Sequence, residues 1–335
     1  MARNAGNPHY RGPSMTNDLK ALVERYLTER RRLGFQLTSV AYSLRSFAEF
    51  VQRSRHRGPL TLEIMARWAR EGSCRCKLPR TWAQRLRQLR AFTRWLQQFE
   101  PTTEVPDDAI FGRRAARGTP HIYSEQEVEE LLAAARGLGP KGDLRSIAYE
   151  TLLGLIASTG LRISEALALR VGDVDLQHGV LTIRRTKFGK SRAVPPHAST
   201  TQALSLYRVR RDLTGAPSGA EEPFFIGTRP DLFGKSMRPH QVRCVFAALR
   251  RELGWGNRGT HHAPRIHDLR HTFIVRRVLL WQQQDIDVDQ AMLSLSTYVG
   301  HAHVTDTYWY LQAVPELMAV AAQRFESCMP EVHYA

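Results

Sequence analysis

The chain contains 335 residues, 42% of them apolar, and carries a formal net charge of +16. This length and apolar fraction predict a globular protein of two domains, each with its own core. The excess of Lys and Arg favours a polyanionic partner, because Lys and Arg side chains that contact a phosphate backbone release its counterions, and this release favours binding. A merely soluble, charged surface is the alternative.

Composition also argues against a membrane or exported protein. No stretch approaches the roughly 18 consecutive apolar residues that a membrane span requires, and the polar residues 1–15 lack the apolar core of a secretory signal. Of the four cysteines, Cys74 and Cys76 are too closely spaced for a metal knuckle, which indicates thiols kept reduced. We expect a cytoplasmic protein with no membrane partner and a disordered tail at residues 1–15.

The positive charge is concentrated in the N-terminal third. Residues 1–117 contain 23 Lys and Arg against 10 Asp and Glu, whereas residues 118–335 contain 25 against 22. This asymmetry predicts a basic binding module joined to a domain with a different task.

Four helical patterns follow one another in residues 16–100. The fourth, near residues 80–99, separates an apolar side from a stripe of arginines. Such a stripe is often only a solvated face, but in so basic a module it favours contact with phosphates. The prediction is a small four-helix bundle that binds DNA. The stripe consists of Arg87, Arg90 and Arg94.

Residues 101–120 contain three prolines and show no apolar period, which predicts an interdomain linker. Its basic run includes Arg113 and Arg114, which could follow a nucleic-acid backbone. The second domain, residues 121–335, begins with a capping box in which Ser124 and Glu127 start a helix.

A helix over residues 147–158 is apolar on nearly all sides, as a buried core helix is. Gly160 ends it, and Arg162 stands between this glycine and a new helix that we expect Ser164 to cap. An arginine held by backbone on both sides suits a preorganised anion-binding fork. A simple ion pair between Arg162 and Glu165 is the alternative.

Three short β segments between residues 174 and 194 predict a small three-stranded antiparallel sheet. Lys187 and Lys190 lie at or beside the tip of its last hairpin. They could reach into a DNA groove, whereas hairpin lysines are more often only solvated.

The region from His267 to Tyr310 carries the chemistry. Histidines and an arginine that could hold a phosphate are followed by tyrosines that could attack it, which suggests phosphoryl transfer through a tyrosine. Tyr310 lies nine residues after a Gly-His pair. The motifs, in order, are Thr159-Gly160-Leu161-Arg162-Ile163-Ser164-Glu165, Thr186-Lys187, His267-Asp268-Leu269-Arg270-His271, Gly300-His301 and Tyr310.

Together these motifs resemble the tyrosine recombinase, or phage integrase, family, and the likeness extends over nearly the whole chain. The Thr307-Tyr308-Trp309-Tyr310-Leu311 segment resembles a subgroup found on transposons and other integrated elements. The resemblance implies a mainly α fold. It comprises an N-terminal SAM-like four-helix core-binding bundle and an α-rich catalytic domain with a small three-stranded antiparallel sheet.

The resemblance also implies which side chains hold the phosphate. Arg162 and Arg270 resemble the two arginines that bind the scissile phosphate, where negative charge accumulates as phosphorus becomes five-coordinate. His301 resembles the residue that hydrogen-bonds a non-bridging oxygen.

The remaining implied roles concern protons and the nucleophile. His267 resembles the histidine that assists proton removal, and Lys187 the general acid for the departing 5′ oxygen. Tyr310 resembles the nucleophile on spacing, with Tyr308 as its rival. A phenol with an unperturbed pKa near 10 is mostly protonated at neutral pH and needs such neighbours to attack.

By the same resemblance the reaction passes through a 3′-phosphotyrosyl link and needs neither ATP nor a metal cofactor. The implied partner is double-stranded DNA with inverted core sites, bound by a dimer per site and a tetramer in synapsis, at the nucleoid. The outcome would be integration, excision or transposition of a mobile element. A C-terminal helix between Pro315 and Phe325 would pack either on a neighbouring protomer or on its own domain.

Three alternatives remain open at this point. A zinc hydrolase could use His267 and His271, at i and i+4, with His301 or His303 as a third ligand. A type IB topoisomerase would share all the catalytic residues but relax DNA without exchanging defined sites. The non-enzyme alternative is a DNA-binding regulator that has lost catalysis.

Overall fold

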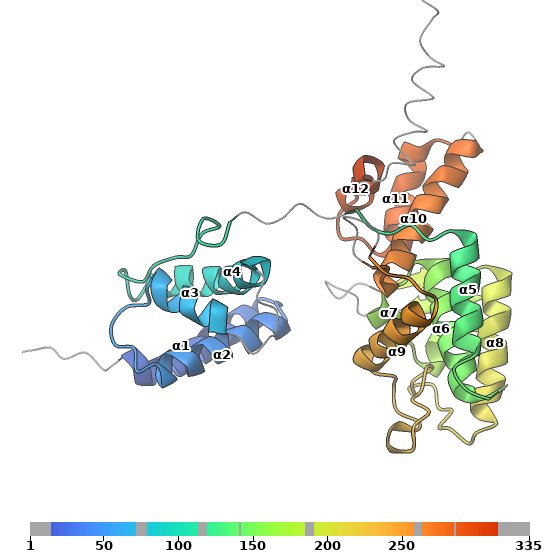
Figure 1. Cartoon of the computed structure of the whole chain (residues 1–335), viewed down its shortest axis with the longest axis horizontal. Helices are drawn as coiled ribbons and strands as arrows, with labels where there is room; N and C mark the ends of the chain where they lie inside the picture. The colour runs from blue at the N-terminus through green and yellow to red at the C-terminus, as the bar shows by residue number, and fades with distance from the viewer. Residues whose placement is uncertain are drawn as a thin grey trace, which may run out of the picture. The chain divides into compact units, whose positions relative to one another are not determined.

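The computed structural model describes residues 15–71, 79–112, 119–140, 142–184, 191–257, 263–284 and 286–313. The chain divides into two compact units, Met1–Arg117 and Gly118–Ala335, here called the N-terminal unit and the C-terminal unit (Figure 1). Most of the described residues are helical, and the strands form one small antiparallel sheet, so the predicted mainly α fold is confirmed.

The N-terminal unit contains four described helices, which correspond to the four patterns in the sequence. Tyr26, Phe92 and Trp95 lie in its core, where their ring centroids are 5.5 to 6.0 Å apart. These aromatic side chains bury large apolar areas and join the first helix to the fourth. The helices are α1 (Met15–Arg32), α2 (Thr38–Arg53), α3 (Leu62–Glu71) and α4 (Pro79–Leu96).

The stretch that follows α4 packs on this bundle as far as residue 112, although its sequence predicts a linker. Thr103 and Pro106 are buried, and the Phe111 ring lies 5.7 Å from that of Trp82 on α4. The backbone N–H of Glu104 donates to the carbonyl of Leu60 at 2.9 Å. Periodicity could not reveal this because the stretch forms no helix or strand. Arg113 and Arg114 lie outside the described residues.

The C-terminal unit is built around α6, most of whose apolar residues are buried, as the sequence predicts, while Ile147 and Ala157 are only partly buried. Helices α5, α8 and α10 pack against it (Figure 1). A smaller apolar cluster joins α10, α11 and α12. The α-helices are α5 (Glu125–Arg136), α6 (Leu144–Thr159), α7 (Ile163–Leu167), α8 (Ala198–Asp212), α9 (Pro239–Glu252), α10 (Ile266–Gln283), α11 (Val288–Val299) and α12 (Thr305–Ala313), with 3-10 turns η1 (Val171–Asp173) and η2 (Pro230–Leu232).

The sheet has the order β1-β2-β3, with β1 (Val174–Asp175), β2 (Val180–Ile183) and β3 (Arg192–Val194) all antiparallel. Leu181 pairs with Val174 on one side and with Val194 on the other, and these apolar side chains face the core. The register places Arg192 opposite Ile183, at the start of β3. Lys187 and Lys190, which were predicted from the sequence to lie at or beside the tip of the last hairpin, lie outside the described residues.

Two predictions at the ends of the chain also fall outside the described part. They are the disordered tail, of which residues 1–14 are not described, and the helix between Pro315 and Phe325. Within the described ranges, no helix is both long and apolar enough to cross a membrane.

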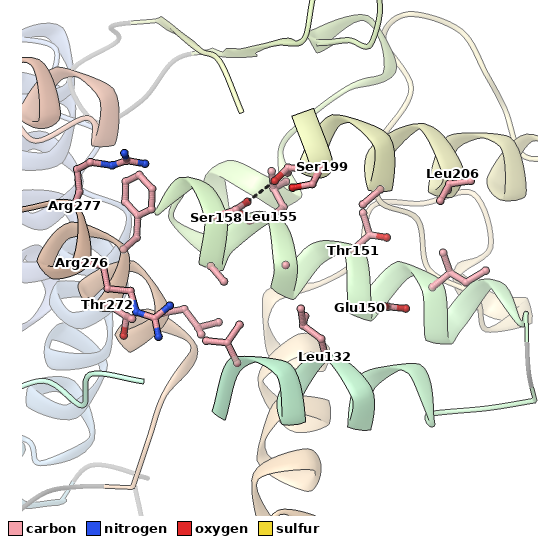
Figure 2. Close-up of a pocket in the computed structure, with 18 of the residues that line it drawn as sticks. Leu132, Glu150, Thr151, Leu155, Ser158, Ser199, Leu206, Thr272, Arg276 and Arg277 are labelled. Carbon is pink, nitrogen blue, oxygen red and sulfur yellow. Dashed lines mark hydrogen bonds between the residues drawn. The ribbon is translucent and has the colours of Figure 1, made fainter. Parts of the chain in front are cut away.

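An apolar groove of about 740 Å³ lies between α5, α6, α8 and α10 (Figure 2). Leu132, Leu155 and Phe273 are among its lining residues, and Arg276 and Arg277 also border it. Helix α10 contributes Leu269 and Thr272 to this groove. The neighbouring residues Arg270 and His271 are not among those that line the groove, so it is distinct from the cluster described below.

We expect that Phe111→Ala lowers the free energy of unfolding by about 2 kcal/mol, less than the 3–5 kcal/mol typical of a fully buried phenylalanine. Phe111 is half-buried against Trp82 and has the Arg70 guanidinium 5.1 Å above its ring. Urea denaturation of the full chain measures the change.

Phe35→Ala is the matched control, because that ring is 54% exposed and its loss should change stability by no more than about 0.5 kcal/mol. Equal effects of the two substitutions would contradict the packing of residues 101–112 on the bundle.

Candidate active site

Arg162 lies at the turn between α6 and α7. Gly160 ends α6 with φ 65°, in the left-handed region that favours glycine, and an added Cβ would lie 2.6 Å from the Phe273 ring. Arg162 itself is the N-cap residue of α7, because the Glu165 side chain accepts from its backbone N–H at 3.1 Å. The prediction that Ser164 caps this helix is therefore wrong.

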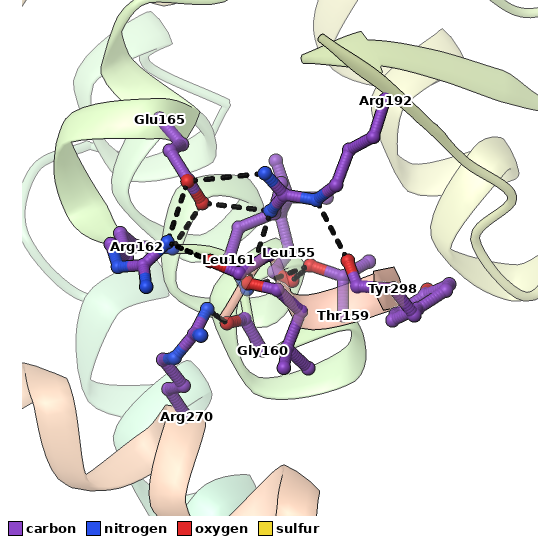
Figure 3. Close-up of polar contacts among 11 residues, drawn as sticks. Leu155, Thr159, Gly160, Leu161, Arg162, Glu165, Arg192, Arg270 and Tyr298 are labelled. Carbon is purple, nitrogen blue, oxygen red and sulfur yellow. Dashed lines mark hydrogen bonds and ion pairs between the residues drawn. The ribbon is translucent and has the colours of Figure 1, made fainter. Parts of the chain in front are cut away.

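A single carboxylate, that of Glu165, binds two guanidinium groups (Figure 3). Its oxygens lie 2.9 Å from Arg162 Nη1 and 2.9 Å from Arg192 Nη2. Burial alone would raise the pKa of Glu165, but the hydrogen bonds and charges of Arg192 and Arg162 bring it below its ordinary value. The carboxylate is thus ionised at neutral pH and fixes both arginines.

Arg192 and Arg162 also hold the end of α11. Arg192 Nε donates to the carbonyl of Tyr298 at 2.8 Å, and Arg162 Nη1 donates to that of Gly300 at 2.9 Å. Gly300 has φ 70°, and an added Cβ would lie 2.5 Å from Arg192 Nη1. The residue before His301 must therefore be glycine for both its conformation and its close approach to Arg192.

Arg270 is the second arginine beside this turn. It is 1% exposed, and its Nη1 donates to the carbonyl of Gly160 at 2.6 Å (Figure 3). Its Nη2 is buried and has no hydrogen-bond partner among the described residues. Burial, and then the nearby charge of Arg162, lower the pKa of Arg270 to about 9. A buried cation with an unused donor is costly unless an anion binds it.

Arg162 and Arg270, here called the arginine pair, are therefore arranged to bind an anion. Each uses Nη1 to donate to the carbonyl of a glycine that ends a helix. The remaining guanidinium N–H groups suit the oxygens of a phosphate, which arginine binds in planar, paired hydrogen bonds.

Two histidines lie near Arg270 on α10. The ring of His267 meets that of His271 edge to face, with centroids 4.6 Å apart. Partial removal from water, and then the charge of Arg270, lower the pKa of His267 to about 4, although solvent still reaches part of the side chain. His267 is thus neutral at pH 7 and able to accept a proton or hydrogen bond.

Tyr310 joins this cluster from α12. It is 1% exposed, and its hydroxyl lies 2.6 Å from Nδ1 of the buried His271. Its ring stacks nearly parallel to that of His301, with centroids 6.4 Å apart. His301 Nδ1 in turn lies 2.7 Å from the hydroxyl of Thr307 on the same helix as Tyr310.

Tyr308 has different surroundings. Its hydroxyl donates to Asp289 Oδ1 at 2.8 Å, near the start of α11, and this hydrogen bond raises the pKa of Tyr308. A tyrosine whose hydroxyl is bound to a carboxylate is a poorer nucleophile than one beside cations, because the negative charge disfavours the phenolate. The geometry therefore favours Tyr310 over its rival.

The fold brings five of the six expected catalytic residues into one region, and the sixth, Lys187, lies outside the described residues. Three further residues contact this cluster but received no catalytic role in the sequence analysis. Glu165 was weighed only as an ion-pair partner and His271 only as a zinc ligand. Arg192 gave no local signal, since its partners Glu165 and Tyr298 lie 27 and 106 positions away.

The arginine stripe on α4 is only partly open to a ligand. Arg87 Nη2 and Arg90 Nη2 each lie 3.2 Å from one oxygen of Asp108, whose pKa the hydrogen bond from Arg87 lowers. Arg90 also donates to the carbonyl of Pro106 at 2.8 Å. Arg94 is exposed. Asp108 belongs to the stretch packed after α4, which is why the sequence pattern did not reveal its contact with the stripe.

An arginine pair beside a buried tyrosine on a mainly helical fold is the arrangement expected of a tyrosine recombinase. Comparison with known proteins agrees. Residues 122–316 match the model of the phage integrase family. The chain is 37% identical over 310 residues to the predicted integrase/recombinase y4rB of Sinorhizobium fredii, covering 91% of this chain and 96% of that protein. It is 28% identical to the tyrosine recombinase XerC of Chlorobaculum parvum, covering 69% and 68%.

Solved structures show the same fold. The integrase of transposon Tn1549, in complex with transposon right end DNA, aligns with a TM-score of 0.61 at 17% identity, covering 91% of this chain and 99% of that one. The XerH site-specific recombinase bound to a palindromic substrate aligns with a TM-score of 0.58 at 18% identity, covering 92% and 84%. The chain belongs to the phage integrase family and is a tyrosine-type site-specific DNA recombinase.

Family membership favours this activity over a topoisomerase or a zinc hydrolase. In the part of the chain that the structure describes, no three His, Cys, Asp or Glu side chains gather as metal ligands would. Of the histidines considered for zinc, His271 instead contacts Tyr310, and His301 contacts Thr307.

We expect that Glu165→Gln lowers the free energy of unfolding by about 3 kcal/mol near pH 7, because it leaves the nearly buried Arg192 and the partly exposed Arg162 without their shared carboxylate. The folded pKa of this carboxyl lies below its ordinary 4.5. Its ionised form therefore contributes stability that is complete above pH 4.5 and is lost as the pH falls through the folded value.

The stability gap between the wild type and Glu165→Gln should accordingly narrow below pH 4.5, as chemical denaturation at several pH values would measure. Glu150→Gln is a matched control, since its partner Arg136 has a side chain that is 64% exposed. A gap that stays constant or widens in acid would contradict the assignment.

Proposed function

We propose that the chain cuts and rejoins DNA strands by attack of Tyr310 on a scissile phosphate held by the arginine pair. The observation that carries this proposal is the buried Nη2 of Arg270, which has no hydrogen-bond partner among the described residues and lies on the same helix as the histidine that contacts the Tyr310 hydroxyl. A phosphate oxygen would give that donor its partner. As phosphorus becomes five-coordinate, the added negative charge would be met by guanidinium groups already in place.

In the proposed step, the Tyr310 Oη–P bond forms and the bond from phosphorus to the 5′ oxygen breaks. The tyrosine proton passes to a histidine, with His267 assisting, and the leaving oxygen takes a proton from Lys187. His301 would hydrogen-bond a non-bridging oxygen. The products are a 3′-phosphotyrosyl link and a free 5′ hydroxyl. Attack by a 5′ hydroxyl on that link reverses the step and joins strands without a nucleotide cofactor.

The proposed substrate is double-stranded DNA with inverted core sites. XerH is bound to a palindromic substrate and lambda integrase forms a dimer on a core site. By analogy we infer a dimer per site and a tetramer in synapsis, acting at the nucleoid in the cytoplasm. The likeness to y4rB and to a transposon integrase supports integration, excision or transposition of a mobile element as the biological outcome.

The N-terminal unit is proposed to bind the DNA through its basic surface, with residues 16–100 as the core-binding domain and residues 121–335 as the catalytic domain. Arg94 is exposed and is proposed to contact phosphate directly. Arg87 and Arg90 would first have to exchange Asp108 for a phosphate. Arg113, Arg114 and Lys190, outside the described residues, remain proposed DNA contacts on their charge and place in the sequence.

Tyr310→Phe should retain specific DNA binding but form no covalent complex, because only the attacking oxygen is removed. A nicked suicide substrate, from which the cleaved end diffuses away, traps covalent protein for denaturing gel electrophoresis. Tyr308→Phe is the matched control and should still form the complex. Covalent trapping by Tyr310→Phe together with its loss in Tyr308→Phe would overturn the nucleophile assignment.

Strand exchange between two defined sites, as opposed to relaxation of supercoiled DNA without a defined site, would separate recombination from a topoisomerase-like activity in the same preparation.

Residues 1–117, which form a compact unit, should bind duplex DNA with an affinity that falls steeply as salt rises. Arg94→Gln should reduce the slope of log affinity against log salt by about 0.9, the value expected for one phosphate contact. Fluorescence anisotropy between low and moderate salt measures both slopes. Arg45→Gln is the control, since Glu24 already binds that guanidinium through both oxygens. Absent or salt-insensitive binding by the fragment would count against the proposal.

A further inference from the structure

We propose that His271, the residue after Arg270, is the direct proton acceptor of the nucleophile. This inference rests on the proposed role of Tyr310. The proton moves from Tyr310 Oη to His271 Nδ1, and the oxygen electron pair so released forms the bond to phosphorus. The bond from phosphorus to the 5′ oxygen breaks, and that oxygen is protonated separately by a general acid.

The geometry that supports this assignment is a single short contact. His271 Nδ1 and Tyr310 Oη are 2.6 Å apart, within the range of an O–H···N hydrogen bond that can transfer a proton. Both side chains are buried, at 3% and 1% exposure, so bulk water does not readily replace either partner. For Nδ1 to accept, the ring proton of His271 must reside on Nε2.

The surroundings of His271 fix its ring. His267 meets it edge to face at 4.6 Å, and the Tyr310 and Trp309 rings lie 5.3 and 6.3 Å from it. An acceptor held on several sides by aromatic rings keeps its direction towards the phenol without a change of rotamer. In this arrangement His267 borders the acceptor, and its assistance is exerted through the His271 ring.

Charge balance makes the transfer depend on the substrate. Accepting the proton would place a positive charge on His271, directly after Arg270, and Arg270 already lies close enough to the charge of Arg162 for its pKa to be lowered. Without an anion these like charges oppose the transfer. A phosphate bound by the arginine pair supplies negative charge that offsets the imidazolium. Tyr310 is therefore activated when the scissile phosphate is in place.

The test uses the full chain and the nicked suicide substrate under single-turnover conditions. His271→Asn keeps a polar side chain near the position of Nδ1 but cannot take up a proton, and His271→Ala removes the ring. Both should slow covalent-complex formation by about 10²-fold or more, the usual contribution of a general base. DNA affinity should stay unchanged. His240→Asn, an exposed histidine on α9, is the matched control and should keep the wild-type rate.

Two further measurements separate proton transfer from a structural role. Added imidazole should restore part of the rate of His271→Ala, more at a pH where imidazole is neutral, and should not restore Tyr310→Phe. A substrate with sulfur in place of the bridging 5′ oxygen releases a thiolate that needs no proton. It should rescue Lys187→Ala but not His271→Asn.

A wild-type or faster rate in His271→Asn would overturn the proposal and make the contact a resting position of Tyr310. Full rescue of His271→Asn by the bridging-sulfur substrate would also overturn it, because the defect would then concern the leaving group. If Tyr310→Phe still forms covalent complex, the proposed nucleophile itself fails, which is a separate result from either of these.

Discussion

The carboxylate of Glu165, shared by Arg162 and Arg192, is the interaction on which the rest of the site depends. It joins the turn after α6 to strand β3, and both arginines reach on to the last carbonyls of α11. One nearly buried and one partly exposed cation held by a single anion would be unfavourable without further partners. Those backbone carbonyls supply the partners, so three segments far apart in the chain are fixed in one arrangement.

The same arrangement explains how the proposed nucleophile, Tyr310, is positioned on the last described helix. Because Arg162 and Arg192 fix the end of α11, they also fix Gly300 and the turn that leads into α12. His301 then contacts Thr307, one turn before Tyr310, and Tyr310 reaches His271 on α10. A chain of short contacts thus connects Arg162 and Arg192 to Tyr310 through the end of α11, the turn that follows it and α12.

Local patterns in the sequence predicted the helices and the sheet, because apolar spacing and capping boxes involve residues close together in the chain, whereas the candidate site residues were assigned by their resemblance to family motifs. What they missed depends on distant partners. Arg192 is recognised only when Glu165 and the end of α11 are brought to it. The Ser164 cap was wrong because Glu165 binds the backbone N–H of Arg162 and so starts the helix earlier. His271 matched a zinc motif, and only the fold shows its contact with Tyr310.

The charges around the arginine pair affect how the proposed site would distinguish a transition state from bound DNA. Arg162, Arg192 and Arg270 carry three positive charges and Glu165 one negative, a net +2, and the carbonyl ends of α6 and α11 offset only part of it. A phosphodiester brings one negative charge, whereas the five-coordinate phosphorus carries nearly two. The electrostatic match is therefore better for the transition state than for bound DNA, and binding the substrate leaves part of the attraction to lower the barrier.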